Sequence, residues 1–365
     1  MRPVFVLSVK QVYMVKVKRF FIYSILSLIL LFIVIALSLS IGSTEYSFSD
    51  VLRLLIYDLF RSLGLRVYSL ENYSRISTIV YSIRLPRTIV ATLAGAGLGI
   101  AGVLVQAITR NPLAEPFLLG LSSTSLTIVG LSILIVPGLL YVRAYIVLAA
   151  FIGALLGFFI TITLSELAGG SALTLILAGI AVSSAFGGLS HIIAFLVQVK
   201  FNMPFLILLL GSFSNVLKGD IHPITISLVI GIIGSMMISK ALNALLYGDE
   251  YASQLGYNPK LTRRIAASLS ALLTGVTVAI AGIIGFIGLV VPHITRFLIG
   301  GGDHRFVIPL SAFIGAILLL ISDIIARILS YTTGITGIPV GAITSIMGAP
   351  FFAYLLVKKM RGSYS

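Results

Sequence analysis

The chain has 365 residues, of which 58% are hydrophobic and only 10% are charged, and its formal net charge is +14. This composition excludes an ordinary soluble domain, in which about half of the residues are apolar and about a quarter are charged. The positive charge does not indicate nucleic-acid binding, because the basic residues punctuate long apolar segments and are better explained by membrane topology. We therefore predict an all-α, multi-pass protein of the lipid bilayer with no nucleic-acid partner.

Nine apolar stretches predict the membrane-spanning helices in chain order. The stretches lie near residues 20–41, 88–108, 117–136, 144–165, 172–198, 222–241, 262–299, 307–329 and 338–357. A helix needs about 20 apolar residues to span a bilayer. The stretch 262–299 would form a helix of about 57 Å, so we expect it to fold back near residues 282–288. The sequence thus predicts about ten transmembrane helices.

The charges between these stretches predict the orientation. An even number of spans places both termini on one side, and the short loops of that side carry most of the basic residues, which is typical of the cytoplasmic side. We therefore expect a cytoplasmic segment 1–19, a single transmembrane domain 20–360, an outer segment 42–87 and a cytoplasmic loop 242–261, all in the cytoplasmic (inner) membrane.

The outer segment contains an amphipathic stretch from Phe48 to Phe60. Ser49 and Asp50 can cap a helix there, and we expect this helix to lie on the outer surface. The linker 61–83 is polar, and we expect it to be irregular.

Nucleotide and metal motifs are absent or misplaced. No G-x-x-x-x-G-K-[ST] loop occurs, so a partner must bind any ATP. Residues 97–102 match the dinucleotide fingerprint but lie within an apolar span, where Gly95 and Gly99 instead indicate close helix packing. With no cysteine and four scattered histidines, we predict no catalytic, cofactor-binding or metal-binding residues.

One carboxylate, Asp323, lies deep within a predicted span. Arg327 follows four residues later on the same helical face, so an ion pair is the simplest interpretation. A proton- or sodium-coupled carrier usually needs more ionisable groups along its path. An intramembrane enzyme would need clustered nucleophiles and bases. Both alternatives stay open but are disfavoured.

Six motifs occur in a characteristic order. They are Arg84-Leu85-Pro86-Arg87, Gln106 with Asn111-Pro112-Leu113-Ala114-Glu115-Pro116, residues 285–293 (GFIGLVVPH), Asp303-His304-Arg305, Asp323-Ile324-Ile325-Ala326-Arg327 and Gly348-Ala349-Pro350. From about residue 20 to 360 the chain resembles the FecCD-type permeases, which import iron-siderophores, haem and cobalamin through ATP-binding-cassette systems.

The resemblance implies a permease rather than an enzyme. It implies a homodimer with the path at its interface, two ATP-binding-cassette ATPase subunits and an extracytoplasmic substrate-binding protein. The cargo implied is a metal chelate, with an iron-siderophore as the default and cobalamin or haem as alternatives.

The resemblance also implies a site for coupling to the ATPase. In the family, the loop between the sixth and seventh spans carries short coupling helices. Its two glycines and a proline could break it into short helices, although a merely solvated loop is the alternative. The matching residues here are Gly248, Asp249, Glu250, Gln254, Leu255 and Gly256.

Docking of the binding protein is implied for Arg84, Arg87 and Arg327. Arginine suits this role because its planar group holds a carboxylate through two hydrogen bonds and keeps its charge. We expect Arg84 and Arg87 to stand in an outward-facing loop with no acidic residue nearby in sequence. Asp323 could instead hold Arg327, and snorkelling at a span end is a further alternative.

A cytoplasmic gate is implied at Asn111 and Leu113, with a second element at Ala172 and Leu173. The second element departs from the cobalamin permease of that family, which carries small hydroxyl residues there. Asn111 could equally cap the helix that follows it.

Overall fold

The protein is seen in a computed structural model that describes residues 9–42, 48–64, 73–117, 119–138, 142–169, 172–202, 209–335 and 337–362. Regular structure in these ranges is entirely helical. Seven helical segments are long and apolar enough to cross a membrane, and three shorter apolar helices lie at Leu121–Ile135, Ile287–Ile299 and Val340–Ala353. The prediction of an all-α, multi-pass membrane protein is confirmed.

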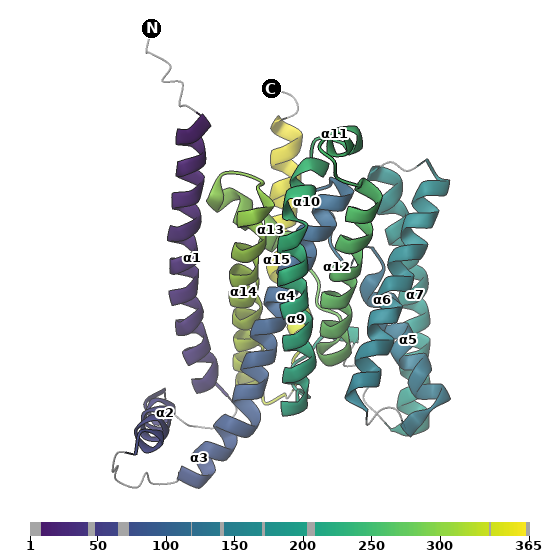
Figure 1. The fold of residues 1–365 in the computed structure, drawn as a ribbon. Helices are drawn as coiled ribbons and strands as arrows, with labels where there is room; N and C mark the ends of the chain where they lie inside the picture. Colours follow the sequence, from purple (N-terminus) through teal and green to yellow (C-terminus); the bar gives the residue numbers. More distant parts are fainter. Residues whose placement is uncertain are drawn as a thin grey trace.

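The helices follow one another with short connections (Figure 1). Their bounds are α1 Val9–Ser40, α2 Phe48–Ser62, α3 Tyr73–Ile79, a π-helical turn Val80–Arg84, α4 Leu85–Thr109, α5 Leu121–Ile135, α6 Arg143–Leu167, α7 Ala172–Phe201, a 3₁₀ turn Lys218–Asp220, α9 Ile221–Met237, α10 Ser239–Leu245, α11 Asp249–Gln254, α12 Pro259–Ala281, α13 Ile287–Ile299, α14 His304–Thr333 and α15 Val340–Gly362.

Helix α4 forms the centre of the bundle and packs against α14, α12, α13 and α9. A Cβ added to Gly95 would lie 2.3 Å from the carbonyl oxygen of Gly315, and one added to Gly99 would lie 2.5 Å from that of Ser311. The backbones of α4 and α14 therefore touch, as small residues allow in membranes. The packing role predicted for Gly95 and Gly99 is confirmed.

Helices α5, α6 and α7 form a second group, which α12 joins to the first (Figure 1). Leu126 of α5, Ile146 of α6 and Ile193 of α7 share a buried cluster with Val278 of α12. This arrangement leaves the end of α6 and the start of α7 beside the end of α4 and the start of α12.

The long apolar stretch 262–299 folds back where the sequence predicts. Helix α12 ends at Ala281 and α13 begins at Ile287. Gly282 has φ 77° and Phe286 has φ 67° between them. The buried carboxylate of Glu115 accepts a hydrogen bond of 3.1 Å from the backbone N–H of Phe286. A hydrogen-bond acceptor at the N-terminus of α13 is favourable there, because the first N–H groups of a helix have no internal partner.

The outer segment is more ordered than predicted. Helix α2 is present, but the expectation of an irregular linker is wrong for residues 73–83, which form α3 and a π-helical turn leading directly into α4. Proline inside a helix normally clashes with the preceding turn, and the wider π turn accommodates Pro86. Buried Ile76 and Val80 pack with Leu54 of α2, which stabilises this extension.

The two ends of the bundle carry different elements (Figure 1). The first turn of α1, the last turn of α15 and helix α11 lie at one end, and α2 and α3 lie at the other. We refer to these as the α11 end and the α2 end.

Candidate functional site

The predicted coupling loop, residues 242–261, includes the end of α10, which begins earlier at Ser239, and the whole of the short helix α11, which lies between its two glycines. Gly248 has φ 124° and Gly256 has φ 81°, values that favour glycine. Between them, Ala252 is buried while Glu250, Gln254 and Leu255 are exposed. Helix α11 thus offers most of its surface to a partner.

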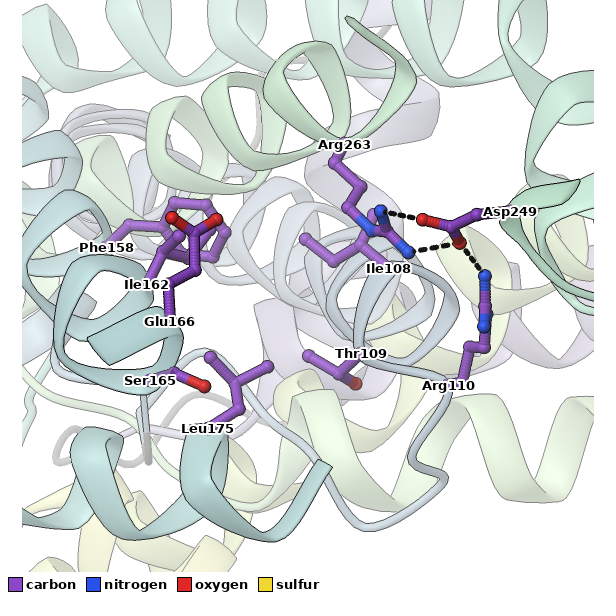
Figure 2. Close-up of a pocket in the computed structure, with 10 residues that line it drawn as sticks. All are labelled: Ile108, Thr109, Arg110, Phe158, Ile162, Ser165, Glu166, Leu175, Asp249 and Arg263. Carbon is purple, nitrogen blue, oxygen red and sulfur yellow. Dashed lines mark hydrogen bonds and ion pairs between the residues drawn. The ribbon is translucent and has the colours of Figure 1, made fainter. Parts of the chain in front are cut away.

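Asp249 is the exception, because its carboxylate faces the bundle (Figure 2). Arg263 of α12 donates from Nη1 to Oδ2 and from Nη2 to Oδ1, both at 2.6 Å. Arg110, at the end of α4, donates to Oδ1 from Nη2. The Arg263 hydrogen bonds, with the charges of both arginines, hold the pKa of Asp249 below its usual value although partial burial raises it. We call Arg110, Asp249 and Arg263 the coupling triad.

Arg110 links α4 to both short helices. It caps α4 in the left-handed conformation, with φ 50°, and its Nε donates to the carbonyl oxygen of Leu245 in α10 at 2.7 Å. Helix α10 is itself held by Asn243, whose Nδ2 donates to Asp303 at 2.8 Å. Arg110 therefore connects the end of α4 directly to both α10 and α11.

The first pair of predicted gate residues comes directly after Arg110. Asn111 Oδ1 accepts a hydrogen bond of 2.9 Å from the N–H of Leu113. Asn111 therefore caps a local turn, whereas α5 begins later with Gly120 as its N-cap residue. The second predicted pair opens α7, where Leu173 is 66% exposed, and the side chain of Ala172 lies outside the described residues.

A cavity of about 410 Å³ lies beside the coupling triad (Figure 2). The triad and the last turn of α4 form one wall, and α6 and α7 form the other, with Glu166 of α6 opposite Arg263. Its lining residues are Ile108, Thr109, Arg110, Phe158, Ile162, Ser165, Glu166, Leu175, Asp249 and Arg263. The cavity separates the last turn of α4 and the triad from α6 and α7 at the α11 end.

The α2 end holds a second ion cluster, around the fully buried Asp323. Arg327 Nη2 lies 3.0 Å from Asp323 Oδ2, which confirms the pair expected from their spacing. Arg87 also binds Asp323, from Nη2 at 2.7 Å and Nε at 3.0 Å. The expectation that Arg84 and Arg87 stand in an outward-facing loop is corrected, because both lie in the continuous helix of the π turn and α4. Packing of α4 on α14 also gives Arg87 an acidic neighbour that sequence distance concealed.

Two of these arginines also cap α1. Arg84 Nη1 donates to the carbonyl oxygens of Leu39 and Ser40 at 2.9 and 2.8 Å. Arg327 Nη1 donates to those of Ser38 and Ile41 at 2.7 and 3.0 Å. The last carbonyls of a helix have no partner within it, and cations are favourable there. The structure therefore brings the three predicted docking residues together, with Arg84 and Arg327 directed inward and buried.

Sequence reasoning did not single out Arg110 or Arg263 as site residues. The available signal for Arg110 was its position directly before Asn111, and for Arg263 its place in the first turns of α12 after the coupling loop. Neither signal identifies Asp249 as the shared partner, which lies 139 residues from Arg110.

Comparison with known proteins gives a consistent picture. A family model described as the FecCD transport family matches residues 30–358. The chain is 38% identical over 288 residues to the iron(3+)-hydroxamate import system permease protein FhuB of Bacillus subtilis, which covers 78% of this chain and 72% of that protein. It is 37% identical over 281 residues to the hemin transport system permease protein HmuU of Yersinia pestis, covering 76% and 83% respectively.

A solved structure is also similar along almost the whole chain. It is described as an inward-facing conformation of a candidate metal-chelate type ABC transporter. The TM-score is 0.71 and the sequence identity is 29%, with 93% of this chain and 99% of that chain covered.

Proposed function

This chain belongs to the FecCD transport family, and from that premise we propose that it is the permease subunit of an ATP-binding-cassette importer for a metal chelate. The observation that carries the proposal is the similarity, over most of the chain, to permeases for iron chelates and to a metal-chelate type transporter. The protein is a multi-pass component of the cytoplasmic membrane. In this proposal ATP is hydrolysed on a partner subunit, and the α11 end faces the cytoplasm.

The proposed assembly is a homodimer of ten-span subunits with two ATPase subunits and a substrate-binding protein. The seven long apolar segments and three shorter apolar helices support that span number. Helix α7 supports the dimer, since Ser184, His191 and Gln198 are exposed on its surface. Polar side chains facing lipid are unfavourable, so such a face is better suited to a partner helix or a watery path.

The proposed cargo is an iron-siderophore, supported by the iron-hydroxamate relative. Haem is the second candidate, because the Yersinia pestis relative is a hemin permease. Cobalamin is the further alternative expected from the family. The substrate-binding protein would select among these chelates.

We further propose that the coupling triad transmits conformational change in the ATPase to the cytoplasmic gate at Asn111 and Leu113. The exposed face of α11, with Glu250, Gln254 and Leu255, would lie against the ATPase. Movement of α11 would pull on Asp249, and Arg110 would transfer that movement to the turn of Asn111 and Leu113. The two hydrogen bonds from Arg263 would fix the orientation of the Asp249 carboxylate toward Arg110. The neighbouring cavity would leave room for these side chains to move.

Docking at the α2 end is proposed mainly for Arg87. Its side chain keeps 17% of its surface exposed, against 8% for Arg327, and Arg84 is similarly buried. Arg87 can therefore approach a carboxylate of the binding protein, whereas Arg84 and Arg327 would act by fixing α1 and Asp323 around it.

The proposal is tested by reconstitution in liposomes. We expect the chain with its ATPase and binding protein to accumulate a ferric hydroxamate only when ATP is present on the α11 side. The chain alone, under an imposed pH gradient, should accumulate neither ferric hydroxamate nor hemin. Accumulation by the chain alone on a proton gradient would contradict the proposal and favour a secondary carrier.

A further inference from the structure

Helix α2 is fixed to the rest of the molecule by one of its faces. Val51 and Leu54 are buried against Leu39 of α1 and against α3 and the π turn. Asp58 accepts hydrogen bonds from the hydroxyls of Tyr73 at 2.8 Å and Tyr81 at 2.5 Å. These contacts set the rotation of α2 about its own axis, so the direction of its remaining faces is determined.

The exposed half of α2 is divided lengthwise into an apolar and a polar stripe. The apolar stripe consists of Leu52, Ile56 and Phe60, which are 45%, 43% and 41% exposed. Residues four apart lie on one face of a helix, and Leu63, just past its end, continues the stripe with 65% exposure. The polar stripe runs beside it and consists of the exposed Arg53 and Arg61 with the half-buried Asp50 and Tyr57.

The neighbouring surface indicates what covers the apolar stripe. Helix α1 is a candidate span with only 6% of its apolar window buried, and Phe21 and Phe32 are among its exposed side chains, so lipid must cover most of it. Helix α2 lies across the end of α1, at the edge of the bundle (Figure 1). Helix α2 therefore lies at the level at which the exposed apolar surface of α1 ends.

We propose that α2 is an interfacial helix that binds the lipid surface at the α2 end of the molecule. Leu52, Ile56 and Phe60 insert among the upper acyl chains, and the polar stripe faces the headgroups and water, as in amphipathic helices that lie in the plane of a membrane. Arg53 borders the apolar stripe, so its guanidinium can reach lipid phosphates while its alkyl chain stays apolar. This partner is independent of the cargo, the ATPase and the direction of transport.

The absence of tryptophan from the chain gives a direct test. Ile56→Trp and Phe60→Trp each place one tryptophan on the apolar stripe, and Arg61→Trp places one on the polar stripe as the matched control. Each full-length variant is reconstituted in phosphatidylcholine vesicles, with or without bromine atoms near the top of the acyl chains. Bromine quenches tryptophan only on close approach.

We expect several-fold stronger quenching for Ile56→Trp and Phe60→Trp than for Arg61→Trp. Equal quenching in all three variants, or no quenching on the apolar stripe, would overturn the proposal. Acrylamide, a water-soluble quencher, supplies the second measurement and should reach Arg61→Trp most readily. If acrylamide reaches Ile56→Trp equally well, and only an added substrate-binding protein shields it, the stripe belongs to a protein partner and the lipid proposal is wrong.

Discussion

The ion clusters at the two ends of the bundle have the same composition but different exposure. At each end one carboxylate joins two arginines, at least one of which comes from a distant part of the chain. Asp323 has no exposed side-chain surface, whereas Asp249 has 46%. Breaking a buried pair leaves an uncompensated charge, while exposed pairs exchange partners for little free energy. The α2-end cluster is therefore suited to a permanent brace, and the coupling triad to contacts that change during transport.

The largest expected effect is the loss of stability when the α2-end ion cluster is broken. Asp323→Ala leaves Arg87 and Arg327 without their shared partner in a buried site, and should lower the free energy of unfolding by about 3–5 kcal/mol. The measurement is the unfolding transition of the purified chain in detergent. Asp249→Ala is the matched variant and should change stability by less than about 1 kcal/mol. Similar losses in the two variants would remove the distinction between the ends.

A smaller loss is expected when α1 loses its cap. Arg84→Gln removes two charge-assisted hydrogen bonds to the carbonyls of Leu39 and Ser40, and should destabilise the chain by about 2 kcal/mol. Proteolysis of the chain in membranes can report this change as easier cleavage between α1 and α2. Arg75→Gln, an exposed change on α3, is the control and should have no such effect. Unchanged protection in Arg84→Gln would argue against the capping role.

The docking residue should show a moderate, salt-sensitive effect. Arg87→Gln, which leaves Arg327 paired with Asp323, should weaken binding of the loaded substrate-binding protein and make the remaining affinity less dependent on salt, because screening acts on exposed charge pairs. Titration of the binding protein onto the reconstituted permease at several salt concentrations measures both quantities. Docking that is unchanged in strength and salt dependence would exclude Arg87 from the interface.

The smallest effect expected is that of lowering the pH on uptake per ATP. The pKa of Asp249 is lowered in the folded protein. The ion pairs of the triad are therefore fully formed above the ordinary aspartate pKa. They are lost only when the pH falls through the lower pKa that Asp249 has in the folded protein. Uptake per ATP should therefore be constant while the pH on the α11 side falls from neutral to about 4, near the unperturbed aspartate value. Loss of coupling well above that pH would show that another group controls the triad.

The sequence predicted local features better than distant contacts. Apolar length located the spans and the break at 282–288, and the four-residue spacing predicted the pair of Asp323 with Arg327. The contact of Arg87 with Asp323 joins residues 236 apart, and it depends on the backbone contact between α4 and α14. Pattern alone marks Gly95 and Gly99 as contact points but not their partners Gly315 and Ser311.

The geometry around α11 was predicted only in part, for a related reason. Gly248 and Gly256 require positive φ and so mark the ends of α11 in the sequence. The capture of Asp249 by arginines of α4 and α12 follows from how three elements converge, which no single segment encodes. The extension of α4 by α3 was missed because a proline usually ends a helix pattern, and a π turn overrides that signal.

The central claim is that Arg110 transmits movement of α11 to the gate. Its most direct test is the amount of cargo imported per ATP hydrolysed by the reconstituted importer, comparing Arg110→Ala with Arg264→Ala, an exposed arginine on α12 beside the triad. We predict that both variants assemble and hydrolyse ATP, and that Arg110→Ala alone loses about tenfold in uptake per ATP, equivalent to about 1.4 kcal/mol of coupling. Equal uptake per ATP in the two variants would contradict the claim.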